Sequence, residues 1–178
     1  MASIPTHMLV GASIGLWFAK SPRVGRTLFI GACCAAIPDL DAVGLWLGVP
    51  YESALGHRGF SHSLVFAGLL ATLIAGTVGR HGLGGTSVKS AWAYAALATA
   101  SHGLLDSLTN GGLGVGFLLP FDASRYFMPW QPIEVSPLGI RPFFTARGVA
   151  IVISELKWVW LPAGLLAAAA RRHRQVSP

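Results

Sequence analysis

Three short segments of the sequence combine histidine and aspartate inside or beside apolar runs. Asp39 and Asp41 lie in an otherwise apolar stretch, and the segment HRGFSHS at 57–63 contains two histidines. His102 and Asp106 lie four residues apart in a third apolar stretch. An ionisable side chain at the centre of a membrane helix costs about 2.5–3.5 kcal/mol on insertion scales, so its presence there predicts a function.

These residue types and spacings predict a divalent metal site. Imidazole nitrogens and carboxylate oxygens favour zinc, with manganese or iron as alternatives. A pair at i and i+4 projects from one helix face and can bind one ion or bridge two. The candidate ligands are His7, Asp39, Asp41, His57, His62, His102 and Asp106. They outnumber the three protein ligands of a single catalytic zinc, so a centre with two ions is plausible.

Three residues are candidates for catalysis. A metal lowers the pKa of bound water toward about 7, and Asp39 or Asp41 could accept its proton or serve purely as a ligand. Arg58 could bind a phosphate bidentately or anchor the chain to lipid headgroups, and Arg125 and Arg141 are weaker candidates. Helix capping, internal hydrogen bonds and interfacial positions remain alternatives for the aspartates and histidines.

The composition indicates that membrane helices position these residues. The chain has 178 residues, of which 53% are hydrophobic and 11% are charged, whereas average soluble domains carry about 25% charged residues. This excludes a disordered chain, and the two adjacent cysteines, Cys33 and Cys34, exclude a disulfide scaffold. The basic residues are dispersed between apolar runs, so the net charge of +6 indicates membrane topology rather than a nucleic-acid surface.

Five apolar segments are long enough, or nearly so, to span a bilayer, which takes about 20 residues. They are residues 4–19, 27–49, 63–79, 90–108 and 148–170. The sequence therefore predicts an all-α fold, a polytopic bundle of about five transmembrane helices in a single integral membrane domain over 1–178. A cleavable signal peptide is the alternative for the first segment, but no Lys or Arg precedes its apolar run.

The charges between the segments predict the orientation. The basic residues form three clusters, Lys20, Arg23 and Arg26; Arg80 and Lys89; and Arg171, Arg172 and Arg174. The positive-inside rule places all three in the cytoplasm, with the N-terminus outside and the C-terminus cytoplasmic. Residues 109–147 are too rich in proline for a continuous helix, and their aromatic residues predict an extracytoplasmic cap loop at headgroup level. The histidines and aspartates then converge near the outer leaflet.

Three motifs together resemble a known family. The segments PDLD at 38–41, HRGFSHS at 57–63 and SHGLLD at 101–106 are similar to motifs of a bacterial inner-membrane family. Its members are described as membrane-bound, metal-dependent hydrolases, one of them LexA-regulated, and as a domain of unknown function. His7 also matches the family pattern, as do residues 119–121 and 135–139, so the resemblance covers roughly residues 5 to 140.

The resemblance implies an activity. The family is distantly similar to zinc-dependent phospholipase C enzymes, which hold several metals with His-x-x-x-Asp/Glu pairs, and His102 and Asp106 match such a pair. This implies a hydrolase, in particular a phosphoesterase acting on a lipid or lipid-linked phosphate at the outer leaflet. The expected partners are membrane lipids and that substrate, and no nucleic acid. The oligomeric state is left open.

Two other functions remain alternatives. A divalent-cation transporter would need polar groups that continue toward the cytoplasm, whereas residues 91–97 contain no ionisable side chain apart from Tyr94. A non-catalytic metal-binding membrane protein would have a closed coordination sphere, which the sequence does not distinguish from a catalytic one.

Overall fold

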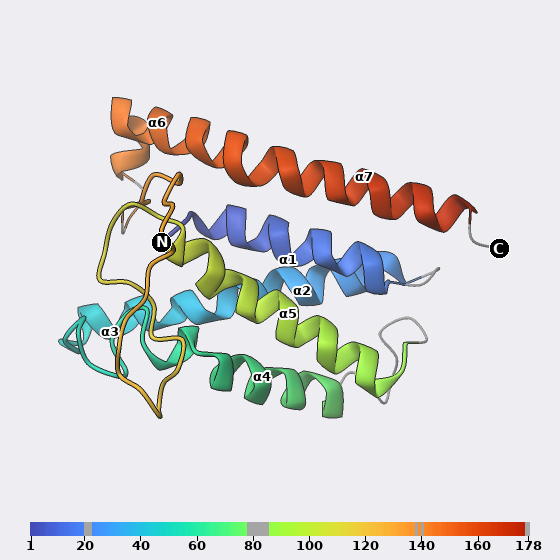
Figure 1. Cartoon of the computed structure of the whole chain (residues 1–178), viewed down its shortest axis with the longest axis horizontal. Helices are drawn as coiled ribbons and strands as arrows, with labels where there is room; N and C mark the ends of the chain where they lie inside the picture. Colours follow the sequence, from blue (N-terminus) through green and yellow to red (C-terminus); the bar gives the residue numbers. More distant parts are fainter. Residues whose placement is uncertain (20–22, 78–85, 138, 140, 177–178) are drawn as a thin grey trace.

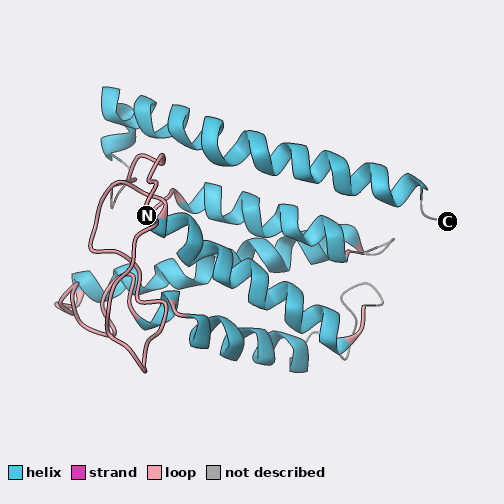
Figure 2. Cartoon of the chain, viewed as in Figure 1, coloured by secondary structure: helices cyan, strands magenta, loops and turns pink. Residues whose placement is uncertain are grey.

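The structure is a computed structural model that describes residues 1–19, 23–77, 86–137, 139 and 141–176. Throughout this part of the chain the regular elements are helices (Figure 2), and pairing between extended residues is limited to two isolated bridges, Thr109 with Ile133 and Val115 with Tyr126. The prediction of an all-α fold is therefore confirmed for the described residues.

Five helical rods lie side by side along the long axis of the molecule (Figure 1). Three of them are single helices, α1 (Ile4–Phe18), α4 (Leu64–Thr77) and α5 (Val88–Ser107). In the second rod, α2 (Val24–Ala36) continues through the 3₁₀ turn η1 (Ile37–Asp41) into the short α3 (Ala42–Trp46). In the last rod, α6 (Ala146–Glu155) continues through the π-helical turn η4 (Leu156–Trp160) into α7 (Leu161–Val176). Each rod corresponds to one predicted apolar segment.

Local sequence signals explain where several of these helices begin. Pro5 lies in the first turn of α1, where its missing N–H has no helical partner to lose. Ser87 caps α5 by accepting a hydrogen bond from the backbone N–H of Ser90. Pro38 falls where α2 gives way to η1, because proline removes a donor from the helical ladder.

Small residues form the tightest packing of the bundle. We call the buried cluster of Cys34, Ala71, Ala75, Ala91, Tyr94, Ala95 and Ala98 the alanine core. Two glycines beside it let α1 and α2 approach closely, since a Cβ on Gly11 would overlap the carbonyl oxygen of Gly31. The hydroxyl of Tyr94 donates to the carbonyl oxygen of Thr27 over 2.8 Å and ties α5 to α2.

Two of the connecting segments lie at one end of the bundle, which we call the loop end. They are the residues between α3 and α4 and the described residues between α5 and α6, and the start of α1 and the turn η1 lie at the same end (Figure 1). As predicted, the described residues of the stretch from 109 to 145 form no α-helix, and α6 begins at Ala146; within this stretch lies the 3₁₀ turn η3 (Arg141–Phe144). Two of its aromatic side chains, Phe121 and Phe144, are 86% exposed.

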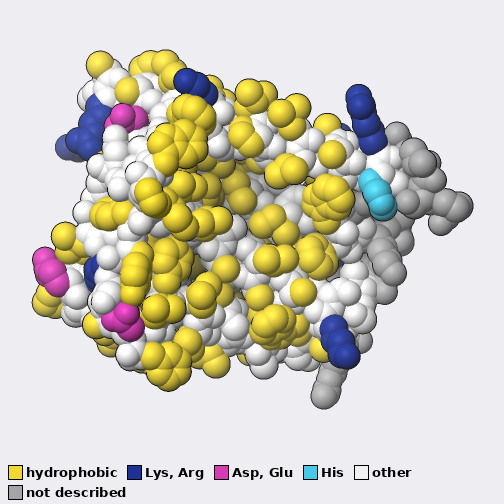
Figure 3. All heavy atoms as spheres, viewed as in Figure 1, with side chains coloured by type: hydrophobic (Ala, Val, Ile, Leu, Met, Phe, Trp, Pro, Cys, Tyr) yellow, Lys and Arg dark blue, Asp and Glu magenta, His cyan; other side chains and the backbone are white. Residues whose placement is uncertain are grey.

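The surface agrees with a membrane environment. Two helices, Val24–Trp46 and Ala146–His173, are long and apolar enough to cross a bilayer, whereas Ile4–Phe18 and Leu64–Thr77 are shorter apolar helices. On the face shown in Figure 3, apolar side chains cover the middle of the molecule and charged side chains lie toward its ends. The length criterion therefore supports two spans, and the count of five stays a prediction.

The basic residues that predict the orientation share one end. Arg23 and Arg26 are exposed at the start of α2, Lys89 at the start of α5, and Arg171 and Arg172 in the last turns of α7. These helix termini lie opposite the loop end (Figure 1). Lys20, Arg80 and the side chain of Arg174 lie outside the described residues. The compartment that this end faces stays a prediction.

Candidate metal centre

The predicted ligands all lie at the loop end because their elements begin or end there. The first turns of α1 carry His7, the turn η1 carries Asp39 and Asp41, and the last two turns of α5 carry His102 and Asp106. The segment before α4 supplies His57 and the 3₁₀ turn η2 (Phe60–His62). The structure thus brings together residues that are up to 99 positions apart, as counted from His7 to Asp106.

Four of these residues form a compact group of ligand atoms. Asp39, His62, His102 and Asp106 are buried, and one nitrogen or oxygen from each lies within 4.8 Å of the others. The Nε2 atoms of His62 and His102 are 3.0 Å apart. Asp39 Oδ1 lies 3.3 Å from His102 Nε2 and 3.9 Å from His62 Nε2. Asp106 Oδ2 lies 3.5 Å from His62 Nε2 and 4.0 Å from His102 Nε2. We call this group the four-ligand site.

The dimensions of the four-ligand site fit a small divalent cation. Zinc bonds of about 2.0–2.1 Å in a tetrahedron place neighbouring ligand atoms about 3.3 Å apart, and the distances above run from 3.0 to 4.0 Å. Both oxygens of Asp39 are buried and have no hydrogen-bond partner, whereas Asp106 Oδ2 makes no hydrogen bond of regular geometry but lies 3.1 Å from Arg58 Nε. Buried carboxylate oxygens are normally paired or bound to a metal, so the oxygens of Asp39 point to a ligand.

Each histidine of the four-ligand site is oriented by a contact to its Nδ1 atom, on the side of the ring away from the site. Nδ1 of His102 lies 2.6 Å from the carbonyl oxygen of Ala35, and Nδ1 of His62 lies 3.1 Å from Asp41 Oδ2. A carbonyl oxygen can only accept, so Nδ1 of His102 carries the proton and Nε2 presents its lone pair. Histidines that bind metals are commonly held this way, with the second nitrogen fixed by a carbonyl or a carboxylate.

The neighbouring carboxylates stabilise the protonated, positively charged form of His62. Burial disfavours the charged imidazole, but hydrogen bonds to Asp106 and Asp41 outweigh it and raise the pKa of His62 to about 9. Without a metal, a proton on His62 therefore neutralises part of the carboxylate charge. A divalent cation in the same place would supply that positive charge instead.

Asp41 and His57 lie in a second group, beside His62, that is already hydrogen-bonded. Asp41, His57 and His62 meet the same 4.8 Å criterion. However, Asp41 Oδ1 lies 2.6 Å from His57 Nδ1, and Oδ2 accepts from the hydroxyl of Ser61 and from the backbone N–H of Arg58. Asp41 and His57 thus form a second group that could hold an ion, although their atoms are paired with protein groups in this structure, and coordination by either residue stays a prediction.

The 3₁₀ turn explains how both aspartates reach the same region. On an α-helix, residues two apart point to nearly opposite faces. With three residues per turn, as in η1, Asp39 and Asp41 diverge by about 120°. One side chain then faces the four-ligand site and the other faces the back of His62. Helix capping, the alternative that the sequence leaves open for the aspartates, is not observed for either: Asp39 makes no hydrogen bond, and Asp41 makes no capping bond at the N-cap of α3.

His7 lies next to the four-ligand site but outside both groups of ligand atoms. Its ring stacks on that of His102, with centroids 3.7 Å apart and an interplanar angle of 15°. Its Nε2 atom lies 3.2 Å from Asp106 Oδ1, the oxygen that faces away from His62. Neither ring nitrogen makes a hydrogen bond of regular geometry. His7 is thus placed to orient Asp106, and the predicted direct coordination is not part of this arrangement.

Arg58 is fully buried and bound to protein groups, which differs from the predicted phosphate clamp. Nε lies 3.1 Å from Asp106 Oδ2, one terminal nitrogen donates to the carbonyl of Gly111 over 2.7 Å, and the other donates to Thr109 Oγ1 over 2.9 Å. Its backbone is left-handed, with φ at 62°, a strained conformation for a non-glycine residue. A phosphate would have to displace these partners, so the geometry favours Arg58 as the counter-ion of Asp106.

The other two arginine candidates are not near the four-ligand site. Arg125 donates to the carbonyl oxygens of Tyr51, Ser53 and His57 and so ties the loops together. Arg141 is exposed in η3. Neither contact set resembles a phosphate site.

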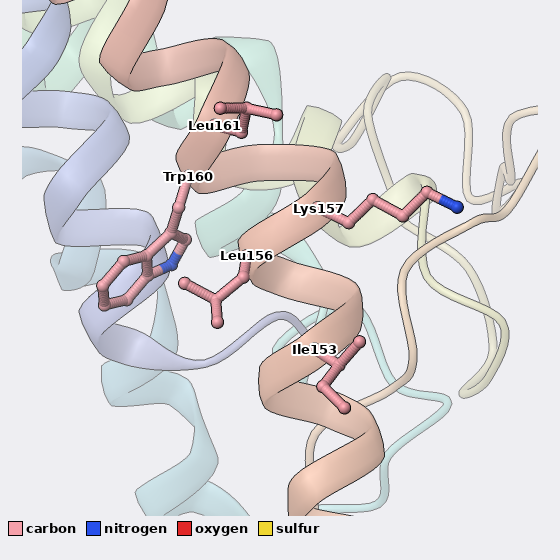
Figure 4. Close-up of a pocket in the computed structure, with 5 residues that line it drawn as sticks. All are labelled: Ile153, Leu156, Lys157, Trp160 and Leu161. Atoms are coloured by element: carbon pink, nitrogen blue, oxygen red, sulfur yellow. The ribbon is translucent and has the colours of Figure 1, made fainter.

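Sequence reasoning missed Glu155. It is a buried acidic residue inside the apolar segment 148–170, and its side chain binds Ser3 and Thr6 at the start of α1. The same feature that identified the aspartates, an ionisable side chain in an apolar segment, could have identified Glu155. A surface pocket of about 620 Å³ lies on the last rod (Figure 4). That pocket is lined by Ile153, Leu156, Lys157, Trp160 and Leu161, none of which is a candidate ligand.

Comparison with known proteins identifies relatives of the whole chain. The sequence model of a family described as YdjM inner membrane protein matches residues 1–174. The chain is also 41% identical over 166 residues to inner membrane protein YbcI of Escherichia coli (strain K12), an alignment that covers 93% of this chain and 95% of that protein. No solved structure matches the chain.

Proposed function

The chain belongs to the YdjM inner membrane protein family, which locates it to the inner membrane, and from this premise we propose that it is a membrane-bound, metal-dependent hydrolase. Its proposed substrate is a phosphoester of a lipid or of a lipid-linked compound. The metal is a single divalent cation, zinc in the first instance with manganese or iron as alternatives, held by Asp39, His62, His102 and Asp106.

One observation carries this proposal. Two imidazole Nε2 atoms lie 3.0 Å apart, and the buried carboxylate of Asp39, which makes no hydrogen bond, lies beside them. Nitrogen and oxygen lone pairs at these distances repel one another unless a proton or a cation lies among them. A core that only stabilised the fold would pair such groups with donors, because an unpaired buried polar group costs about 1–3 kcal/mol.

The chemistry follows from the ligand set. A divalent cation that is bound by these two histidines and two carboxylates, and that keeps a further position open for water, would generate a hydroxide nucleophile near neutral pH and neutralise charge on a phosphoryl oxygen. Asp39 has both oxygens free of hydrogen bonds, so its second oxygen is the best-placed proton acceptor among the described residues. Asp41 holds His62, and Arg58 and His7 hold Asp106.

The proposed orientation puts the site at the outer leaflet. The basic residues exposed at the end opposite the loops favour a cytoplasmic position for that end. Five spans, with the N-terminus outside and the C-terminus cytoplasmic, are consistent with the five rods. Exposed aromatic residues of the cap loop, such as Phe121 and Trp130, suit the headgroup region, through which a lipid substrate would enter.

The alanine core weighs against the transporter alternative. An ion pathway needs polar groups along the whole membrane depth, whereas that core is formed by alanines, Cys34 and Tyr94, whose hydroxyl is hydrogen-bonded to two carbonyl oxygens. A non-catalytic metal-binding protein would share the four-ligand site. It differs only in turnover, so the decisive measurement is turnover by metal-loaded protein.

The experiment combines metal analysis with an activity panel. We would purify wild type and the double variant His102→Ala with Asp106→Ala in detergent, measure bound metals by mass spectrometry, and assay both with phosphomonoester, phosphodiester and phospholipid substrates. We expect about one equivalent of metal and release of phosphate or headgroup for wild type only. Glu52→Gln, which removes an exposed carboxylate from the loop end, serves as the matched control.

Three outcomes would contradict parts of the proposal. Metal retained at full stoichiometry by the double variant would remove these residues from the coordination sphere. Metal-loaded wild type without turnover on any substrate class would favour the non-catalytic alternative. For the orientation, a reporter that is active only in the cytoplasm should be active when fused after Arg174, and an inactive fusion would invert the proposed topology.

A further inference from the structure

Glu155 is a buried carboxylate that the proposed chemistry does not use. It ends α6, is 3% exposed, and binds the first turn of α1. One oxygen accepts the backbone N–H of Ser3 over 2.5 Å, and the other accepts the hydroxyls of Ser3 over 2.6 Å and Thr6 over 2.7 Å. The indole N–H of Trp160 also donates to the Thr6 hydroxyl over 2.7 Å, and Figure 4 shows this side chain extending toward α1.

A second carboxylate binds the same turn from the side of the four-ligand site. Asp106 Oδ1 accepts the backbone N–H of Ala2 over 2.9 Å and lies 3.2 Å from His7 Nε2. Ser3 connects the two carboxylates, because its amide binds Glu155 while its carbonyl oxygen accepts the N–H of His7 over 3.1 Å. Glu155 and Asp106 therefore hold the start of α1 between them.

Glu155 holds the N-cap residue of α1 rather than its first helical N–H groups, because it accepts the N–H and hydroxyl of Ser3 and the hydroxyl of Thr6. The first N–H groups of a helix have no partner within the helix, and the helix dipole favours a negative charge there. Ser3 occupies the N-cap position but makes no capping bond with its own side chain, which binds Glu155 instead. Loss of the carboxylate would leave buried donors unpaired in this turn and loosen it.

We propose that Glu155 is a positioning residue of the metal centre. By fixing the first turn of α1, it keeps Ala2 and His7 against Oδ1 of Asp106, so that Oδ2 faces His62 and His102. A bound cation would require Asp106 Oδ2 to be held in a fixed position. This inference therefore rests on the proposed function. Outer groups that orient a ligand typically change metal affinity about 10- to 100-fold when removed.

The test measures the metal site and not only stability. Wild type, Glu155→Gln, Glu155→Ala and the control Glu134→Gln, which changes an exposed carboxylate in the cap loop, are titrated with Co²⁺ in detergent. The readouts are the dissociation constant, the visible absorption spectrum of bound Co²⁺ and the melting temperature. We expect about 10- to 100-fold weaker binding and an altered spectrum for Glu155→Ala. Glu155→Gln should lose less, because its amide oxygen can still accept the Ser3 N–H, and Glu134→Gln should match wild type.

The outcomes separate this inference from the proposed function. Wild-type affinity and spectrum in both Glu155 variants would overturn it, even if their melting temperatures fall, because a purely structural bond explains that result. If Glu155→Ala does not fold, the spectrum and affinity of Glu155→Gln decide alone. Absence of Co²⁺ binding by wild type would instead overturn the proposed function, and this inference with it.

Discussion

The two ends of the bundle differ in the kind of side chain that they bury. In the alanine core, small apolar residues on regular helices pack around Tyr94, and the helices approach closely at Gly11 and Gly31. At the loop end, charged and polar side chains are buried among irregular segments, and Arg58 has a strained backbone. Close packing of small groups needs no partner, whereas each buried charge needs a specific one. The two halves therefore differ in kind: one is closely packed from small residues, and the other depends on specific partners for its buried charges.

The largest predicted effect comes from removing a charge at the loop end. Asp106→Ala leaves Arg58 buried without its carboxylate, and breaking a buried ion pair by deleting one partner costs about 3–5 kcal/mol. It also removes one of the four ligand atoms. We expect a strong fall in the free energy of unfolding, measured by denaturation in detergent, together with loss of bound metal.

A second substitution separates the two consequences of Asp106→Ala. Adding Arg58→Met removes the uncompensated charge, so much of the stability should return because an apolar pair can replace a buried ion pair. The metal should not return. Metal bound at wild-type affinity by this double variant would contradict the four-ligand site, and no recovery of stability would contradict the pairing of Arg58 with Asp106.

The next effect probes the other half of the comparison. A Cβ on Gly31 would overlap the hydroxyl oxygen of Tyr94 and lie 2.6 Å from the carbonyl oxygen of Gly11. Gly31→Ala should therefore destabilise the protein by at least about 1–3 kcal/mol through overpacking. Gly68→Ala is the matched control, because a Cβ there meets nothing within 4 Å, and it should raise stability by about 0.5–1 kcal/mol. Similar melting temperatures for the two variants would show that α1 and α2 are not in close contact.

A smaller effect sharpens the distinction between ligands and the residues behind them. Asp41→Asn keeps the shape of a side chain whose oxygens accept from His57, Ser61 and the amide of Arg58, but its amide nitrogen cannot accept. Metal affinity should fall about 10- to 100-fold without being abolished. Asp39→Asn should lose more, because Asp39 is a proposed ligand in the four-ligand site. Isothermal titration with Zn²⁺ measures both affinities, with Glu52→Gln as the control. If Asp41→Asn bound Zn²⁺ more weakly than Asp39→Asn, Asp41 would be the ligand and Asp39 the orienting residue.

The sequence predicts which residues lie at the loop end better than it predicts which of their atoms contact one another. Apolar length and charge placement are enough to predict five helical segments, and helix direction alone puts His7, His62 and Asp106 at one end. Which atom faces which depends on the 3₁₀ turn at Asp39 and Asp41, and on backbone carbonyls such as that of Ala35. These are features of tertiary packing that periodicity does not encode.

Two other differences between the sequence-based expectations and the structure have a similar physical origin. The sequence predicts that Arg58 binds a phosphate or anchors the chain to lipid headgroups, yet the loop after α5 supplies Thr109 and Gly111 as its partners. Gly59 could be predicted at a tight turn, but the left-handed residue is Arg58, and Gly59 is needed because a Cβ there would overlap the carbonyl oxygen of Ala54. Both depend on segments distant in sequence or on backbone detail.

The smallest predicted effect tests whether the alanine core needs its polar group. Tyr94→Phe removes the hydroxyl that donates to the carbonyl oxygens of Thr27 over 2.8 Å and Gly11 over 3.3 Å. The net value of such a hydrogen bond is about 0.5–1.5 kcal/mol, and both carbonyls lie in helices, so we expect a modest fall in melting temperature. Metal affinity and the Co²⁺ spectrum should stay at wild-type values, because the hydroxyl lies in the half of the bundle that holds no candidate ligand among the described residues. A Tyr94→Phe variant that keeps its stability but loses metal would show that the two halves are coupled, and the division between a closely packed half and a binding end would then fail.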